Sequence, residues 1–464
     1  MTADVWELPV ALGIGERPEL IALVGGGGKT SLMFALAAAL PGRVVMTTTT
    51  RIFAAQMSRA PAVAFEGDLG SLDEALATQR RVLIVGRVEG EKAVGVDPTL
   101  PARVLAHENV DYVLVEADGS RTRPVKAPAE HEPVIPPGAT LLVPMAGMDA
   151  LELTIEEVAH RPEIIRGITN DELRMRNEEG PSEVGGRLTP AGLARVLAHP
   201  LGGLKGAPEG ARIVPFLNKA DTPERLAAAR ETAALLLREP RIQRVVVGAL
   251  RSTVQVREVW RRVAGVVLAA GESRRMGRNK LLLPWDETTV LERTLRNVAG
   301  SGVLETMVVV GHERELTESL SRDYGAAIHN QNYAKGMLSS VQAAVRELAP
   351  TFEAALVMLG DQPLVEPGII DALLSAYAAN PRGLIAPTYR GQRGNPVIID
   401  RRYFAELLAL PPEAAPRVLL QRHPDDLLLV EVDSDAILHD LDRPEDYERL
   451  RPGQSATDGV DSTN

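Results

Sequence analysis

Cysteine is absent from all 464 residues of this sequence. The chain therefore forms no disulfide bond, no zinc–thiolate site and no iron–sulfur ligand. It also lacks the thiol that carries sulfur as a persulfide. Carboxylate, lysine and arginine side chains must perform whatever chemistry the protein catalyses.

Basic residues are fewer than acidic ones. The sequence has 51 lysines and arginines against 62 acidic residues, so its formal net charge is -11. Nucleic-acid binding needs a basic surface that releases counterions from phosphates, so we expect no nucleic-acid partner. Long apolar runs are also missing, since no stretch approaches the roughly 20 apolar residues of a membrane span. The first residues, MTADVWELPVALG, do not have the pattern of a secretion signal. We therefore expect no membrane partner and a cytoplasmic location.

Length and composition indicate two ordinary globular domains, with 45% hydrophobic and 24% charged residues. From Pro18 the sequence passes from an apolar strand pattern through a glycine run to an alanine-rich helix pattern, and a strand and glycine loop return at Val263. We place the domains at residues 1–260 and 261–452, with the boundary at the charged stretch REVWRR. Residues 453–464 are expected to form a disordered tail.

Short apolar runs alternate with helical patterns through both halves. DYVLVEA and TLLVPMAG in the first half, and TMVVVG and AALVMLG in the second, are typical of strands in a parallel sheet. The fold class that we predict is α/β, with two doubly wound, mostly parallel α/β/α domains.

In the second half, VVLAAGESRRMGRNK runs from a predicted strand into a basic loop. Small residues allow backbone amides to approach a triphosphate closely, and nearby cations supply positive charge. A basic surface loop is the alternative, but the joint occurrence of these residues at short spacing favours phosphate binding. The residues concerned are Leu268, Ala269, Ala270, Gly271, Arg274, Arg275 and Lys280.

Two later segments supply carboxylates. Asp361 follows an apolar strand in GDQP, and Asp440 and Asp442 precede a predicted helix in HDLDRPEDY. Each could simply cap a turn or a helix. Two carboxylates near one cation site are, however, what metal-assisted nucleotidyl transfer requires, so we predict that Asp361 and Asp442 bind Mg²⁺.

These motifs, together with NQNYAKGMLSS and RGNPVIID, resemble in order those of the molybdenum cofactor cytidylyltransferases, which belong to the MobA-like nucleotidyltransferases. The resemblance implies a Rossmann-like domain in which Arg275 and Lys280 contact the triphosphate. It also implies that CMP passes from CTP to molybdopterin, or to its molybdenum form, with release of pyrophosphate. The segment near base and ribose would contain Asn330, Ser339 and Ser340.

Two departures within this resemblance bear on the substrates. Asn395 stands where relatives commonly have a histidine, which leaves the acceptor open. Ala270, in LAAG rather than LAGG, favours CTP over GTP. A guanylyltransferase, a sugar-phosphate nucleotidyltransferase and a delivery chaperone without catalytic activity are the alternatives.

The first half contains LVGGGGKTS, a P-loop-like run between a predicted strand and a predicted helix. In such loops the amides cradle phosphates, Lys29 would reach the β- and γ-phosphates, and Thr30 would bind Mg²⁺. A tight turn without a ligand is the alternative. The glycines are Gly25, Gly26, Gly27 and Gly28.

Two further segments fit a nucleotide site. Glu116 and Asp118 end an apolar strand, where an acidic residue holds Mg²⁺ through water. Asn218, Lys219 and Asp221 form the NKAD motif by which many GTPases read guanine, although so short a motif also arises by chance. We predict that this half binds GTP or ATP.

VGGGGKTS, TTTTRIF, the NKAD segment and EADGSRTRPVKAPAEHEPVIPP resemble the YqeC family, accessory proteins of selenium-dependent molybdenum hydroxylases. This resemblance implies a client molybdenum hydroxylase as partner. The basic residues of the long segment either form an anion pocket or belong to a loop folded over the nucleotide site. They are Arg121, Arg123, Lys126 and His131.

Overall fold

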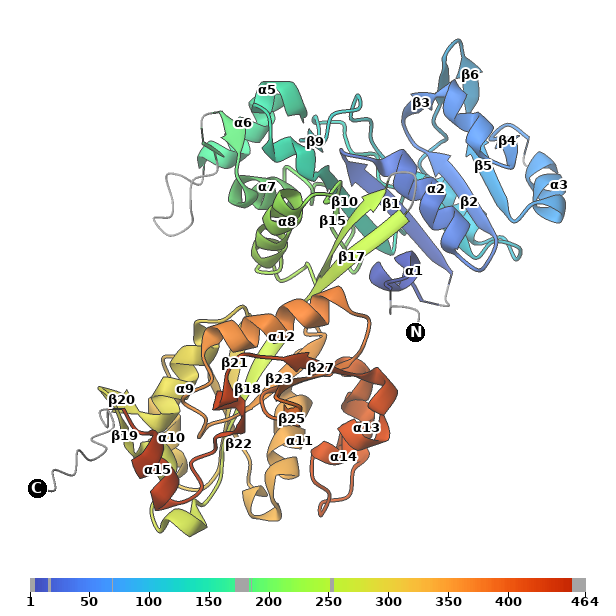
Figure 1. Cartoon of the computed structure of the whole chain (residues 1–464). Helices are drawn as coiled ribbons and strands as arrows, with labels where there is room; N and C mark the ends of the chain where they lie inside the picture. The colour runs from blue at the N-terminus through green and yellow to red at the C-terminus, as the bar shows by residue number, and fades with distance from the viewer. Residues whose placement is uncertain are drawn as a thin grey trace, which may run out of the picture. The chain divides into compact units, whose positions relative to one another are not determined.

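The structure is a computed structural model, which describes residues 5–15, 18–68, 70–171, 183–184, 186–250 and 254–452. The chain separates into two compact units, Met1–Trp260 and Arg261–Asn464. Each unit contains a large sheet with helices packed against it (Figure 1). Residues 453–464, for which we expected disorder, lie outside the described residues.

The N-terminal unit is built on a ten-stranded sheet. Its strands span Glu19–Gly25 (β1), Val44–Thr48 (β2), Ala62–Phe65 (β4), Arg81–Val85 (β5), Tyr112–Glu116 (β8), Leu141–Gly147 (β10), Arg212–Ile213 (β14), Phe216–Asn218 (β15), Arg244–Leu250 (β16) and Val254–Arg261 (β17). The order is β17-β16-β15-β10-β1-β8-β2-β5-β4, with β14 beside β10. Neighbouring strands from β16 to β4 are parallel, which confirms the predicted pairing.

Helices cover this sheet on both faces. They span Leu8–Ala11 (α1), Lys29–Ala39 (α2), Gly70–Thr78 (α3), Leu100–Leu105 (α4), Ile155–Val158 (α5), Pro162–Asp171 (α6), Pro190–Ala198 (α7) and Pro223–Leu236 (α8). Ile21 and Leu23 of β1 share one apolar cluster with Leu32 of α2, whereas Leu20 and Ala22 are buried on the opposite face. Strand side chains alternate between faces, so a strand buried on both sides reads as a continuous apolar run.

Short strands complete this unit. Arg51–Phe53 (β3), Arg87–Glu89 (β6) and Lys92–Val94 (β7) form a small antiparallel sheet. Val125–Lys126 (β9) pairs with Ala159–His160 (β11), and Glu183–Val184 (β12) pairs with Arg187–Leu188 (β13).

The charged stretch REVWRR, which we interpreted as a domain boundary, lies largely within β17. Val256 and Val259 of this strand are buried in the core. Glu258 is also buried, and it accepts hydrogen bonds from Arg230 of α8 and from the indole of Trp260. Pairing with a cation allows a charged residue in a buried strand. The division between the two compact units falls within this stretch, between Trp260 and Arg261.

The C-terminal unit contains an eight-stranded mixed sheet. Its strands span Val263–Ala269 (β18), Glu305–Val310 (β21), Ala326–His329 (β22), Ala354–Leu359 (β23), Leu384–Tyr389 (β24), Gln392–Arg393 (β25), Val397–Asp400 (β26) and Leu427–Glu431 (β27). The order is β22-β21-β18-β23-β26-β24-β25, with β27 beside β24. The first four strands are parallel, but β26 is antiparallel to both of its neighbours. The α/β class with mostly parallel sheets is thus confirmed for both units.

Alternating residues of β18 enter two different cores. Val263 and Val267 pack with α9 and α12, whereas Ala264 and Val266 pack with α11 and α13. The central strands are therefore sandwiched between two helical layers (Figure 1). The helices span Val290–Ala299 (α9), Arg314–Ser321 (α10), Met337–Glu347 (α11), Pro367–Ala379 (α12), Phe404–Ala409 (α13), Arg417–Arg422 (α14) and Pro444–Leu450 (α15). Pro284–Trp285 (β19) and Thr288–Thr289 (β20) form a hairpin.

Within the described ranges, none of the helices combines the length and the apolar character that crossing a membrane demands.

Candidate nucleotide sites

The carboxyl ends of β18 and β23 create the first site. Leu268 of β18 is paired with Leu359 of β23, so the residues that follow both strands meet at one edge of the sheet. A cavity of about 310 Å³ lies at this edge, where parallel α/β sheets bind ligands. The predicted residues that line it are Leu268, Ala270, Gly271, Lys280, Ser340, Asp361 and Asp442.

Lys280 is the electrostatic centre of this cavity. Its ammonium forms ion pairs with Asp361 and with Asp442, the latter at 3.0 Å, and Arg275 reaches the other oxygen of Asp442 at 2.8 Å. Burial favours the neutral amine, but the charge of Asp361 and the bonds to both carboxylates raise the pKa of Lys280 above its usual value. Burial acts likewise against ionised Asp442, yet Lys280 and Arg275 hold its pKa below the usual range. Both predicted cations and both predicted carboxylates therefore meet at one point.

A third carboxylate, Asp440, adds negative charge to the same cavity. Burial, together with the charges of Asp361 and Asp442, raises the pKa of Asp440 to about 6. Gln362 donates a hydrogen bond to Asp440 Oδ1 at 2.7 Å and fixes its orientation. The cavity thus holds more negative charge than Lys280 neutralises, which suits a divalent cation.

Other predicted residues act indirectly or lie elsewhere. The side chain of Ala269 packs into the apolar core. Asn330 is buried and donates to the hydroxyls of Ser339 and Ser340 at 2.8 and 3.0 Å, so it fixes the start of α11. Arg274 and Arg275 line an adjoining cavity of about 320 Å³, which also contains Gly271, Lys280 and Asp442.

A neighbouring cavity of about 350 Å³ was not predicted from the sequence. Met337, Leu359 and Asp440 line both this cavity and the one around Lys280. Its walls are largely apolar, but Arg393 and Arg417 add two exposed guanidinium groups. No motif points to Arg417, and only the folding of α14 against the sheet brings it here. Asn395 belongs to the same wall.

The glycine run forms the second site, in the N-terminal unit. Gly27 and Gly28 have φ angles of 76° and 130°, which side chains rarely tolerate. A Cβ on Gly27 would lie 2.2 Å from the amide nitrogen of Gly147, and one on Gly28 would lie 2.5 Å from Asn218 Nδ2. The glycines therefore allow the loop to pack against the end of β10 and against Asn218.

The loop amides are not all free for phosphate. Those of Gly25, Gly26 and Gly27 donate within the protein, to Asp118, to the carbonyl of Met145 and to the carbonyl of Arg123. The first amides of α2 have no partner within their own helix and carry the positive end of its dipole. Phosphate binding would therefore depend on the start of α2 more than on the first glycines, which differs from our expectation.

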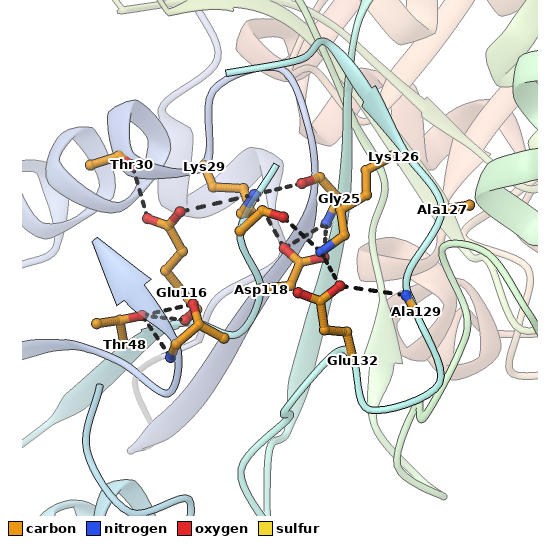
Figure 2. Close-up of polar contacts among 12 residues, drawn as sticks. Gly25, Lys29, Thr30, Thr48, Glu116, Asp118, Lys126, Ala127, Ala129 and Glu132 are labelled. Atoms are coloured by element: carbon orange, nitrogen blue, oxygen red, sulfur yellow. Dashed lines mark hydrogen bonds and ion pairs between the residues drawn. The ribbon is translucent and has the colours of Figure 1, made fainter. Parts of the chain in front are cut away.

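Lys29 and Thr30 begin α2 and point toward the end of β8 (Figure 2). The Thr30 hydroxyl donates to Glu116 Oε2 at 2.8 Å, and Lys29 Nζ lies 3.2 Å from Asp118 Oδ1. Burial raises the pKa of Glu116, although Lys29 and the Thr30 hydroxyl favour its ionised form. All four predicted residues are thus adjacent.

A cavity of about 460 Å³ extends from the glycine loop to the NKAD segment. Asn218 lies between the two, because its amide nitrogen donates to the carbonyl of Gly27 at 2.7 Å and its oxygen accepts from the amide of Leu250. Asp221 accepts from Arg225 at 2.8 Å. The predicted residues that line this cavity are Gly27, Gly28, Lys29, Thr30, Glu116, Asn218 and Lys219.

The basic residues of the EADGSR segment do not gather in one pocket. Arg121 is exposed and lines the cavity, whereas Lys126 is fully buried and forms ion pairs with Asp118 and Glu132. Arg123 and His131 are exposed. A buried lysine that is already paired with two carboxylates has no capacity left for an anion, so a pocket built from all four cations is wrong.

Metal ligation is incomplete at both sites. In the part of the chain that the structure describes, no three His, Asp or Glu side chains are arranged to hold a metal ion. Mg²⁺ is commonly bound by one or two carboxylates together with substrate phosphates and water. Asp361 with Asp442, and Thr30 with Glu116, fit this pattern.

Comparisons with known proteins match the two units separately. Residues 265–427 match the family model of the MobA-like NTP transferase domain, and residues 21–163 match that of the YqeC protein. The uncharacterized protein YqeC of Escherichia coli K12 is 33% identical over 237 residues, which cover 49% of this chain and 86% of that protein.

The C-terminal unit has relatives of its own. The molybdenum cofactor cytidylyltransferase of Escherichia coli K12 is 30% identical over 184 residues, which cover 39% of this chain and 92% of that protein. A crystal structure of a Mycobacterium tuberculosis H37Rv protein in complex with manganese is 26% identical and covers 41% of this chain and 98% of that chain, with a TM-score of 0.35.

Because each half covers most of a relative with at least 30% identity, the chain belongs to two families, with an N-terminal YqeC domain joined to a C-terminal MobA-like NTP transferase domain.

Proposed function

We propose that the C-terminal domain transfers CMP from CTP to the terminal phosphate of molybdopterin, or of its molybdenum form, and releases pyrophosphate. The observation that carries this proposal is the cluster in which Lys280 lies between Asp361 and Asp442, beside Arg275, at the edge of the sheet. The Escherichia coli relative named molybdenum cofactor cytidylyltransferase supports the choice of substrates.

In the proposed reaction, an oxygen of the acceptor phosphate attacks the α-phosphorus of CTP. The bond to the β-phosphate oxygen breaks, and pyrophosphate leaves. The acceptor is already anionic at neutral pH, so no general base is needed. Positioning of the reactants and neutralisation of their charge would account for the rate acceleration. Lys280 and Arg275 would bind the triphosphate, and Lys280 would then exchange its carboxylate partners for phosphate oxygens.

Asp361 and Asp442 would hold Mg²⁺, which neutralises the charge that builds up at the α-phosphate. Release of Lys280 leaves these two carboxylates and Asp440 without their cation, so the metal and the nucleotide are expected to bind together.

The cavity lined by Arg393 and Arg417 is the proposed acceptor site. Apolar walls suit the flat faces of a pterin, and guanidinium groups suit an anionic tail. It shares Asp440 with the nucleotide cavity, so donor and acceptor would meet at that carboxylate. Ala270 lines the nucleotide cavity and its methyl group narrows the space for a base, which favours cytosine over guanine.

The test is an assay of pyrophosphate release by the full chain with Mg²⁺, molybdopterin and each of CTP, GTP and ATP, with Lys280→Ala as control. We expect release with CTP that requires molybdopterin. Preference for GTP would instead indicate a guanylyltransferase, and activity only with sugar phosphates would indicate that enzyme class. Binding of the cofactor without any turnover would favour a delivery chaperone.

For the N-terminal domain we propose binding of GTP or ATP, in support of a client molybdenum hydroxylase. The observation that favours it is the joint position of Lys29, Thr30 and Glu116 at one end of a cavity whose other end contains Asn218. Lys29-dependent binding of a nucleoside triphosphate, measured by calorimetry with Lys29→Ala as control, tests this proposal.

A further inference from the structure

A row of charged side chains with alternating sign lies behind the glycine loop (Figure 2). Lys29 Nζ is 3.2 Å from Asp118 Oδ1, Asp118 Oδ2 is 3.1 Å from Lys126 Nζ, and Lys126 Nζ is 2.9 Å from Glu132 Oε2. The side chains of Lys29 and Asp118 are each 2% exposed, and that of Lys126 is 0% exposed. Buried charges are stable only when paired, so each member of this row constrains the next.

Asp118 has no capacity left for a metal. The amide of Gly25 donates to both of its oxygens at 3.1 Å, Lys29 pairs with one oxygen and Lys126 with the other. A carboxylate offers about four acceptor positions, and these contacts occupy them. Asp118 is also not among the residues that line the cavity in the described part of the chain.

Glu116 differs from Asp118 both in its position and in how many of its acceptor positions are occupied. It lines the cavity, accepts one hydrogen bond from the hydroxyl of Thr30, and lies 3.9 Å from Lys29 Nζ. Its carboxylate and the Thr30 hydroxyl together offer two oxygen ligands at the wall where a triphosphate would bind. Mg²⁺ readily uses such a pair when phosphates complete its coordination.

The ammonium group of Lys29 is turned back onto its own loop. It donates to the carbonyl of Gly25 and also pairs with Asp118 (Figure 2). To reach a phosphate this ammonium must leave Asp118. Asp118 then keeps Lys126 as its cation, while Glu132 is paired with both Lys126 and Arg161.

We infer that Asp118 is a positioning residue rather than a metal ligand: it holds Lys29 against Gly25 until a nucleoside triphosphate arrives with Mg²⁺ on Thr30 and Glu116. This inference rests on the nucleotide binding proposed above.

The two ends of the row should respond with opposite sign. Asp118→Asn keeps an acceptor for the amide of Gly25 but removes the charge that holds Lys29. Lys126→Met removes the competing cation, so Asp118 holds Lys29 more tightly. Because apparent affinity scales with the fraction of binding-competent protein, we expect nucleotide affinity to rise about tenfold in the first variant and to fall about tenfold in the second.

The measurement is calorimetric titration of the full chain with GTP and with ATP in the presence of Mg²⁺. All proteins carry Lys280→Ala, which weakens triphosphate binding in the other domain, and Lys29→Ala identifies the signal of this site. Lys205→Met is the matched control, because Lys205 bonds the carbonyls of Ala129 and Glu130 but is outside the ion row. It should leave the affinity unchanged.

A fall in affinity and in Mg²⁺ dependence with Asp118→Asn would make Asp118 a metal ligand and overturn the inference. If that variant does not fold, Lys126→Met decides, since unchanged or higher affinity contradicts the proposal that Asp118 holds Lys29. Lys29-dependent binding that neither variant alters refutes only this role of Asp118. Absence of such binding in the parent protein refutes the proposed nucleotide site, and the role of Asp118 with it.

Discussion

The two domains place a lysine in nearly the same local setting, and they neutralise it in different ways. In each, a lysine that follows a glycine-containing turn meets carboxylates that follow the adjacent parallel strand. Lys29 is 2% exposed, and the carboxylates near it are also paired with the buried Lys126 and the partly exposed Arg161. Lys280 is 17% exposed and faces three carboxylates, and among the described residues Arg275 is the one other cation that pairs with them.

The charges of the N-terminal site balance one another, whereas those of the C-terminal site do not. The N-terminal network satisfies its own charges, so a ligand must displace an existing ion pair. Burial and the charges of Asp361 and Asp442 raise the pKa of Asp440 in the C-terminal cluster, whose excess negative charge favours a divalent cation. We therefore expect changes of charge to affect metal-dependent catalysis in the C-terminal domain and binding equilibria in the N-terminal domain.

The largest expected effect is that of Asp361→Asn. The amide keeps the size of the side chain but loses the charge that would hold Mg²⁺, so pyrophosphate release should fall by about 10²- to 10³-fold. The rate is measured with saturating CTP and molybdopterin. Asp323→Asn, on the exposed surface of the same domain, should leave the rate unchanged. Normal turnover by Asp361→Asn would show that Asp361 only caps its turn.

A smaller effect is expected at the base end of the N-terminal cavity. If Asp221 reads guanine, Asp221→Asn replaces an acceptor with a donor, so GTP should bind about tenfold more weakly and XTP more tightly. Arg225, which now pairs with Asp221, would have to leave that oxygen or bind beside the base.

Titrations with GTP, ATP and XTP measure this, again with Lys280→Ala in the background. Asp149→Asn is the matched comparison, because Asp149 pairs with Lys219 in the same cavity and should give no preference for XTP. Equal affinity of the parent protein for ATP and GTP would indicate that the NKAD segment is a strand-end turn that does not recognise guanine.

Asp440→Asn should have a modest effect on stability that depends on pH. The folded pKa of about 6 lies above the ordinary value of 3.8, so the folded protein binds the extra proton as pH falls and gains stability from pH 7 toward pH 4. Asn removes the unfavourable charge and keeps the acceptor for Gln362. At pH 7, without Mg²⁺, it should raise the free energy of unfolding by about 1 kcal/mol, allowing for partial solvent screening.

This gain should disappear near pH 4, where Asp440 of the parent protein is protonated. Urea unfolding at both pH values measures it, with the exposed Asp433→Asn as control. A gain of equal size at both pH values would contradict the electrostatic origin.

The smallest expected effect on the transfer rate comes from separating the domains, which we propose are residues 1–260 and 261–452. A fragment that starts at Arg261 should keep the transfer rate of the full chain, because each domain has its own core. A fragment that starts at Val263 should be less stable than one that starts at Arg261, because Arg261 is buried and pairs with Asp400 at 2.9 Å. Breaking such a pair costs about 3 kcal/mol, visible in thermal unfolding. An inactive Arg261 fragment beside an active full chain would indicate a shared site.

Much of the fold was predictable because central parallel strands carry a strong signal. Runs such as TLLVPMAG and AALVMLG are buried on both faces, and few other structures need so many consecutive apolar residues. The small antiparallel sheet was missed, since its strands β3, β6 and β7 are short and partly exposed. β17 was not predicted as a strand, because its buried Glu258 is neutralised by Arg230, which lies far away in the sequence.

The sequence by itself determined the two families, the two glycine loops, and the cations and carboxylates that stand close to them in ordered motifs. Short-range spacing carries these features, because a strand, a turn and a helix start are local structures. Only the tertiary structure decided which charges are paired, since it buried Lys126 between Asp118 and Glu132. It also placed Arg393 and Arg417 in the wall of one cavity. Ion pairing depends on distance and burial, and both are set by contacts between segments that the chain order leaves far apart.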